Sequence, residues 1–293
     1  MPMLGMADGL MQRLRIAMTS SDNDARDVTA AQTGAGYRVV PLPRSRRVMA
    51  ALMNVAGSRR LMVAFVEADV TKPRRLIHEH RSHTGESISF TAYVAACLAR
   101  AVRQHPQLNS IRRGRRLILF EDVNVVCYLE QFHGDEPVVG FLTLRAADRA
   151  SVRELSLRFR AGVPQGSPLP WPMRHLPVVF VSPAVRYLSR NSRFLANAGV
   201  IAISNVGAGS GGVPGWGFAP SATSVEVTLG AIAKRLASHG GEIGEQEHLC
   251  LTVSIDHDLI DGAAGARFVR TFVDLVSSGV ALDALLHTAP GDA

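Results

Sequence analysis

One segment of the chain combines an apolar strand pattern with side chains that could move protons. Residues 249–268 read LCLTVSIDHDLIDGAAGARF, and alternate residues of a strand face the same way. The predicted core face consists of Leu249, Leu251, Val253 and Ile255. His257 continues this face at the end of the strand, so its imidazole would be partly desolvated and able to act as a base near pH 7. A packed core histidine is the alternative interpretation.

Asp261 and Gly262 follow His257 at the expected start of a helix. Aspartate is a favoured N-cap, and a carboxylate at this place can also pair with an arginine. A histidine at a strand end, followed by Asp-Gly at the next helix start, therefore indicates a candidate catalytic segment.

Two other patterns carry weaker signals. His78, Glu79, His80 and His83 suggest a metal site, but on a helix residues 80 and 83 share a face that excludes residue 78, so we predict no metal. The glycine-rich stretch 207–217 follows a strand, yet Pro214 and the lack of a following helical pattern disfavour a dinucleotide site. We expect a loop bordering a substrate channel, with Trp216 as a lining residue.

Strands and helices that could position these residues are predicted to alternate along the chain. Strands are predicted at 61–70, 116–121, 123–129, 138–145, 199–205, 224–232 and 248–257. Helices are predicted at 71–83, from Ser89 to before Pro106, after a cap at Asp148, from Ser182 to near Gly199, and at 262–277 before Gly279. Residues 162–177 hold five prolines and are predicted to form a loop. This interleaving predicts a layered, mixed α/β fold.

Composition narrows the classes of protein further. The 293 residues are 47% hydrophobic and 19% charged, which excludes a disordered chain, and no apolar run is long enough to span a membrane. Three scattered cysteines predict reduced thiols and a cytoplasmic location.

The net charge of +7 suits phosphorylated partners, but the arginine runs lack stacking aromatics, so we predict no nucleic-acid binding. Residues 1–36 are predicted to be a poorly ordered extension, and residues 37–293 the folded domain.

Several ordered motifs give the candidate segment a specific resemblance. His257-x-x-x-Asp261-Gly262 resembles the active-site signature of the 2-oxoacid dehydrogenase acyltransferases, whose catalytic domains share a fold with chloramphenicol acetyltransferase. Further matching segments are Val40-Pro41-Leu42 with Arg46-Arg47, residues 95–109 (AACLARAVRQHPQLN), residues 203–207 (ISNVG) and Gly230-Ala231-Ile232. The resemblance covers roughly residues 38–278 and implies a chloramphenicol acetyltransferase-like mixed β-sheet sandwich with helices, assembled as a trimer or a multiple of one.

The resemblance also implies a reaction. His257 would take a proton from an acceptor thiol, hydroxyl or amine, which attacks the thioester of an acyl-coenzyme A, while Ser204 would donate to the oxyanion. Asp261 would orient the loop through an ion pair, and His257 and Ser204 would come from neighbouring subunits. The arginine excess suits the phosphates of coenzyme A without singling out which arginines bind them.

The chain also departs from the family pattern. Asp258 stands where an arginine usually follows the histidine, and a carboxylate there would favour the protonated imidazole. We find no lipoyl domain and no subunit-binding domain, so any lipoyl group is not on this chain and a lipoyl or carrier protein would have to act in trans. We therefore expect a stand-alone acyltransferase, the alternative being a catalytically weak trimeric scaffold or binding protein.

Overall fold

Alternating and continuous apolar segments form a six-stranded mixed sheet in the order β3-β10-β9-β8-β6-β7. The computed structural model describes residues 32–34, 37–40, 42–133, 136–162, 177–207, 213–239 and 242–282. The sheet strands are β3 (Leu61–Asp69), β6 (Val125–His133), β7 (Glu136–Leu144), β8 (Ile201–Asn205), β9 (Val225–His239) and β10 (Glu242–Asp256). β8 runs parallel to β6 and β9, and the remaining pairs are antiparallel. The predicted mixed α/β fold is confirmed.

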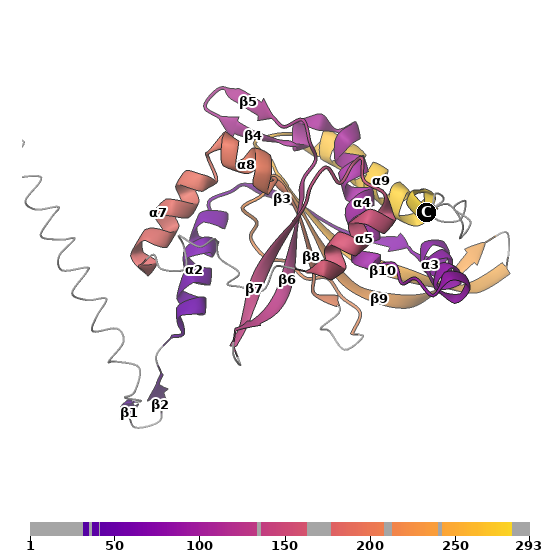
Figure 1. Ribbon diagram of the computed structural model, residues 1–293, viewed down its shortest axis with the longest axis horizontal. Coiled ribbons are helices and arrows are strands. Elements are labelled where there is room, and N and C mark those ends of the chain that lie inside the picture. Colours follow the sequence, from indigo (N-terminus) through magenta and orange to yellow (C-terminus); the bar gives the residue numbers. More distant parts are fainter. Residues whose placement is uncertain are drawn as a thin grey trace, which may run out of the picture.

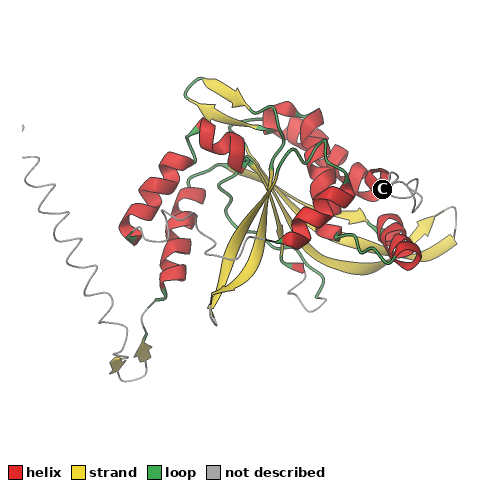
Figure 2. Cartoon of the chain, viewed as in Figure 1, coloured by secondary structure: helices red, strands yellow, loops and turns green. Residues whose placement is uncertain are grey.

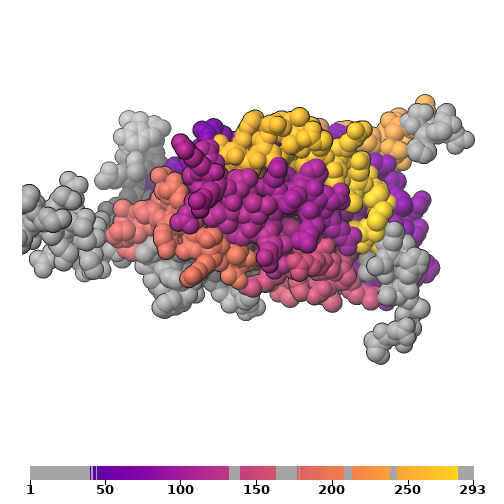
Figure 3. All heavy atoms as spheres, turned by 90° about the horizontal axis from the view of Figure 1, so that it is seen from above, coloured from indigo at the N-terminus to yellow at the C-terminus, as the bar shows by residue number. Residues whose placement is uncertain are grey.

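Helices cover one face of this sheet, as Figures 1 and 2 show. They are α3 (Thr71–Thr84), α4 (Phe90–Gln104), α5 (Val152–Ala161) and α9 (Gly262–Ser278). As predicted, Ser89 caps α4 by accepting from the Ala92 N–H at 3.3 Å, and Pro106 follows in a short 3-10 turn, η2 (Pro106–Leu108). The Tyr93 hydroxyl donates to the Val276 carbonyl at 2.6 Å, which joins α4 to α9, and Figure 3 shows these two segments side by side.

The end of α9 also follows the sequence prediction. Gly279 adopts a left-handed conformation with φ of 75°, which ends the helix, and η4 (Val280–Leu282) returns to the core. The phenyl rings of Phe268 and Phe272 stack with centroids 6.4 Å apart and are fully buried. This apolar side of α9 fixes the helix whose first residue follows Asp261.

Two short hairpins accompany the main sheet. β1 (Gln32–Gly34) pairs with β2 (Tyr37–Val39), so the predicted domain boundary at residue 36 falls between two paired strands. Residues 1–31, most of the predicted extension, lie outside the described residues. β4 (Ser110–Arg113) pairs with β5 (Arg116–Leu119) around Gly114 at φ of 62°, and this hairpin carries the second arginine run.

The region before β8 corrects one helix prediction. A single helix was expected from Ser182, but α7 (Val178–Leu188) begins earlier and a separate α8 (Ser192–Ala198) follows. Asn191 caps α8 by accepting from the Phe194 N–H at 3.1 Å, which separates the two helices. Ser182 does not cap α7; its hydroxyl donates to the Ala51 carbonyl at 3.1 Å and ties α7 to α2 (Arg44–Ala56). The predicted loop at 162–177 falls almost wholly outside the described residues.

The cap of α5 is a second correction. Asp148 was predicted to cap this helix, but Ser151 does so by accepting from the Glu154 N–H at 3.1 Å. The buried Asp148 carboxylate instead accepts from the Val123 N–H at 3.3 Å. Among the residues that the structure describes, no helix is both long enough and apolar enough to cross a bilayer.

Candidate active site

His257 lies at the first position after β10, as predicted. Its backbone N–H donates to the Arg60 carbonyl at 2.8 Å, which continues the β10–β3 ladder by one residue. The Leu259 N–H then donates to the Asp256 carbonyl at 3.0 Å and closes a turn. The core face predicted for β10 is buried, but this turn lifts His257 away from it, and the imidazole is exposed in the single chain. The expected partial desolvation is therefore not met within one chain.

Asp261 is the N-cap of α9. Its Oδ1 accepts from the Ala264 N–H at 2.9 Å, and its carbonyl accepts from the Gly265 N–H at 2.9 Å. The ion pair that the resemblance implied does not form with any of the described residues. The carboxylate meets the free N–H groups and the positive end of the helix instead, so Asp261 fixes where α9 starts.

Paired charges flank His257 on both sides in the sequence. Arg59 bonds to Asp256, which is 6% exposed, through its guanidinium. Asp258 accepts from the Arg60 Nε at 3.0 Å and lies 3.2 Å from a terminal nitrogen of Arg112. The hydrogen bond from Arg60, helped by the charge of Arg112, holds the pKa of Asp258 below its usual value. The carboxylate next to the imidazole is thus neutralised by two arginines.

Ser204 lies on β8, on the sheet face opposite the helices, and is half-buried. It is in register with Tyr128 of β6 and Thr228 of β9, and Thr228 is in register with Thr252 of β10. These side chains form a polar row across the sheet. The neighbouring Asn205 amide donates to the Thr91 hydroxyl at 3.0 Å.

The backbone at Gly207, just after Ser204, lies close to that of Gly230 on β9, and Gly230 in turn lies close to Gly215. A Cβ added to Gly230 would collide with the Gly215 carbonyl oxygen, and one added to Gly207 would collide with the Gly230 carbonyl oxygen. The Trp216 indole donates to the Val66 carbonyl at 3.0 Å, so it reaches across to β3. Residues 208–212 lie outside the described residues, and the predicted channel role of Trp216 stays a prediction.

The strand register separates His257 from Ser204 within one chain. Ser204 is level with Thr252 through Thr228, and His257 lies five residues beyond Thr252. At about 3.3 Å per residue this is roughly 16 Å along the strands, besides the two strand spacings across the sheet. One copy of the chain cannot bring the two side chains into contact.

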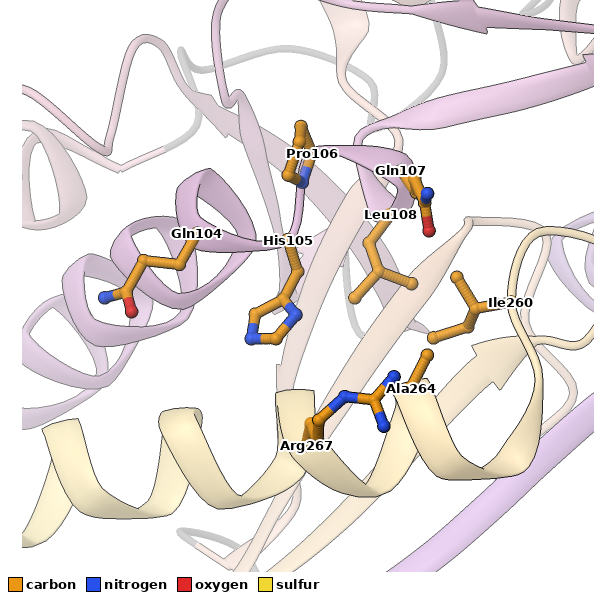
Figure 4. Close-up of a pocket in the computed structure, with 8 residues that line it drawn as sticks. All are labelled: Gln104, His105, Pro106, Gln107, Leu108, Ile260, Ala264 and Arg267. Atoms are coloured by element: carbon orange, nitrogen blue, oxygen red, sulfur yellow. The ribbon is translucent and has the colours of Figure 1, made fainter.

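A cavity of about 230 Å³ lies behind the turn that carries His257. It is formed by the end of α4, by η2 and by the start of α9, and Figure 4 shows His105 and Arg267 between the two helices. Burial, together with the charge of Arg267, lowers the pKa of His105. Neither His257 nor Ser204 lines this cavity.

The histidines of α3 do not form a metal site. His80 is buried, and its Nε2 lies 3.0 Å from Glu86, which also receives Arg153 at 2.8 Å. Within the described ranges, no three His, Cys, Asp or Glu side chains are arranged to hold a metal ion. Glu86 therefore links His80 of α3 to Arg153 of α5.

Sequence reasoning missed the arginines around the turn. Arg59 and Arg60 directly precede the predicted strand at 61–70, which pairs with the strand carrying His257. Arg112 belongs to one of the arginine runs, which were weighed above only for phosphorylated partners and nucleic acid. The sequence does hold a signal for this pairing, because Asp256 and Asp258 flank His257 and two consecutive arginines, Arg59 and Arg60, precede the partner strand. The pairing can be recognised only once the register of the two strands is known.

Solved structures resemble this fold at low sequence identity. A probable dihydrolipoamide acetyltransferase from Listeria monocytogenes matches with a TM-score of 0.62 and 20% identity, over 89% of this chain and 99% of that one. A truncated catalytic core of the 2-oxoacid dehydrogenase multienzyme complex from Thermoplasma acidophilum matches with a TM-score of 0.60 and 17% identity, over 83% and 99%. Dihydrolipoamide acetyltransferase from Azotobacter vinelandii matches with a TM-score of 0.63 and 18% identity, over 85% and 94%.

The fold is thus that of acyltransferase catalytic cores. The family model for the catalytic domain of the 2-oxoacid dehydrogenases acyltransferase matches residues 34–130 and 196–282, a span that includes Ser204, His257 and Asp261. The chain belongs to this family. No curated protein sequence matches it.

Proposed function

We propose that this protein is a coenzyme A-dependent acyltransferase whose active site combines His257 of one copy with Ser204 of another. The observation that carries the proposal is their placement. Both lie inside the family match, yet the register of β8, β9 and β10 keeps them roughly 16 Å apart along the strands and two strands apart across the sheet. A homo-oligomer, most simply a trimer, brings one copy's His257 end against another's Ser204 end.

A spacing in a solved relative supports the same residues. The work on the Azotobacter vinelandii enzyme concerned the role of a serine, a histidine and an asparagine in its catalytic mechanism. The histidine and the asparagine are four positions apart there, as His257 and Asp261 are here. The serine precedes the histidine by 52 positions there and by 53 here. Asp261 then serves the site by setting the start of α9.

The reaction follows from the groups at the site. The His257 imidazole takes the proton of an acceptor thiol, and the sulfur attacks the thioester carbonyl of acyl-coenzyme A. The Ser204 hydroxyl donates to the resulting oxyanion. Collapse of the tetrahedral intermediate breaks the bond to the coenzyme A sulfur, which takes the proton back from the imidazolium. A hydroxyl or amine acceptor, or the thiol of a lipoyl group, would follow the same path.

The structure weakens one of the two motives for the scaffold alternative. This motive was a carboxylate beside the base, and Asp258 is paired with Arg60 and Arg112. Two arginines therefore offset the negative charge that follows His257 in the sequence. The other motive, that no lipoyl domain was predicted, is not affected by this pairing.

Consumption of acyl-coenzyme A by a small dithiol acceptor tests the activity. His257→Ala should lower turnover by about 10²–10⁴-fold, the usual contribution of a general base. The matched control is His83→Ala, an exposed histidine of α3, which should leave turnover unchanged. A wild-type oligomer that transfers no acyl group from any of a panel of thioesters would support the scaffold instead.

Mixing two inactive variants tests the shared site. Subunits carrying His257→Ala and subunits carrying Ser204→Ala are refolded together. In a cyclic oligomer with random mixing, each site has an intact histidine half the time and an intact serine half the time, so about one quarter of the wild-type activity returns. Mixtures that form mixed oligomers yet stay as inactive as the separate variants would contradict a site shared between copies.

A further inference from the structure

We propose that Asp258 is a positioning residue for His257, because it ties the turn that carries the imidazole to β3 and to the β4–β5 hairpin. The role of His257 as the base rests on the proposed function, whereas the geometry of the turn does not. The turn, residues 256–259, ends β10 at the edge where the candidate base is exposed.

Arg60 holds the turn at two points. Its carbonyl accepts from the His257 N–H at 2.8 Å, and its guanidinium donates to Asp258, with Nε 3.0 Å from Oδ1. A second nitrogen of the same guanidinium reaches that oxygen at 2.5 Å. One residue at the start of β3 therefore fixes the main chain of His257 and the side chain next to it.

Arg112 holds the turn from a separate element. Its Nε donates to the Gly114 carbonyl at 3.1 Å, which orients the guanidinium within the β4–β5 hairpin. A terminal nitrogen then lies 3.2 Å from the other oxygen of Asp258. The Asp258 N–H also donates to the Asp256 carboxylate at 3.1 Å, and Arg59 bonds to that carboxylate. The turn is restrained by β3, by the hairpin and by its own strand end.

Stability alone does not account for this arrangement. The side chains of Arg60 and Arg112 are 72% and 51% exposed, and ion pairs this exposed contribute little to stability. Displacing a catalytic group by about 1 Å can lower a rate by roughly 10²-fold. The larger consequence of losing Asp258 is therefore a change in where the imidazole lies and in the charge around it.

The charged groups on either side of His257 in the sequence, with their arginine partners, set the direction of a second effect. Three guanidinium groups, those of Arg59, Arg60 and Arg112, surround two carboxylates, those of Asp256 and Asp258. Neutralising Asp258 leaves a larger excess of positive charge beside the imidazole, which disfavours the imidazolium. The acid limb of the pH profile of kcat should then move to lower pH.

The test compares Asp258→Asn with the conservative Asp258→Glu and with a matched control. Asp122→Asn is the control, because Asp122 is also a surface partner of an arginine, Arg149, at 2.6 Å. Asp258→Asn should lower kcat about tenfold with KM within about twofold and shift the acid limb downward. Asp258→Glu should recover most of kcat, and Asp122→Asn should change nothing. An Asp258→Asn profile that matches wild type would overturn the proposal.

A second measurement separates this proposal from the proposed function. In protein carrying ¹³C-labelled histidine, the His257 signal is assigned as the one lost in His257→Gln. That signal should move and titrate at lower pH in Asp258→Asn but not in Asp122→Asn, whether or not acyl transfer is detected. An unmoved signal would contradict the positioning role even in an active enzyme. A moved signal in an inactive wild-type protein would leave the positioning role in place and reject acyl transfer.

Discussion

The end of β10 that carries His257 and the end of β8 that carries Ser204 hold their candidate catalytic groups by different means. At the His257 end, arginines and aspartates from β3, β10 and the β4–β5 hairpin restrain an exposed turn. At the Ser204 end, main chain lies against main chain where Gly207, Gly215 and Gly230 meet, and the serine stands in a polar row on the sheet. Charge restrains the first end, and steric fit restrains the second.

This difference determines how each end tolerates change. An exposed ion pair can be lengthened, screened or replaced at a small free-energy cost. A close backbone contact cannot relax without moving two strands or loops. Substitutions at the His257 end should therefore alter rates and pH dependence, whereas those at the glycines of the Ser204 end should alter folding.

The largest expected effect is on catalysis at the Ser204 end. Ser204→Ala removes the hydroxyl proposed to donate to the oxyanion, and the loss of one such donor lowers kcat by about 10²–10³-fold. KM for the thioester should change little, because the donor acts on the transition state. Ser82→Ala, at an exposed serine of α3, serves as the control. A Ser204→Ala enzyme within twofold of wild type would remove Ser204 from the site.

The next largest effect is on folding at the same end. Gly230→Ala places a Cβ against the Gly215 carbonyl and should lower the free energy of unfolding by about 1–3 kcal/mol in urea titrations. Gly244→Ala on β10 is the matched control, because no atom lies within 4 Å of its added Cβ. It should stabilise the protein slightly by reducing the entropy of the unfolded chain. Equal effects of the two substitutions would show that the contact is not restrictive.

The sequence predicted elements well where local pattern and packing agree. α4 has an apolar stripe, a serine cap and a following proline, and α9 has an aspartate cap and a terminal glycine, so both helices were predicted within a residue or so. The same local logic failed at Asp148, where two candidate caps lie three residues apart. Tertiary contact with Val123 decided between Asp148 and Ser151.

The candidate site was predictable in its residues but not in its surroundings. His257 and Asp261 stand where the strand and helix patterns place them. The exposure of His257 depends on a turn, and the pairing of Asp258 depends on β3 and β4 lying on either side of it. These contacts join residues about 150 to 200 positions apart, which no local pattern encodes.

Two carboxyls should give stability changes of opposite sign with pH. The pKa of Asp258 is lowered by Arg60 and Arg112, so its stabilising contribution is present above about pH 4 and is lost as pH falls further. The pKa of Glu226 is raised by burial, with Ser221 as a hydrogen-bonding partner. Its contribution is fully present below its unfolded value of 4.5 and is lost as pH rises through the raised pKa.

Thermal unfolding of Asp258→Asn and Glu226→Gln across pH 3–8 tests this contrast. Asp258→Asn should lower Tm by about a degree or two near neutral pH, and the gap to wild type should narrow as the pH falls below about 4. Glu226→Gln should raise Tm near neutral pH, because the buried amide has no charge to desolvate, and this gain should vanish in acid. Two curves that run parallel to wild type would show that neither carboxyl changes its ionisation on folding.

The smallest expected effect concerns Gly262, which stands in the signature after Asp261. Its added Cβ would meet only the Met62 sulfur at 4.0 Å, and alanine is the better helix former, so Gly262→Ala should change stability by less than about 0.5 kcal/mol. Gly265→Ala is the comparison, since its Cβ would press on the flexible end of Met62. A large destabilisation by Gly262→Ala would show that the start of α9 is packed more tightly than the single chain indicates. A stable variant that has lost activity would instead show that the open space beside Asp261 is filled by substrate or by the neighbouring copy, as a site shared between the two ends requires.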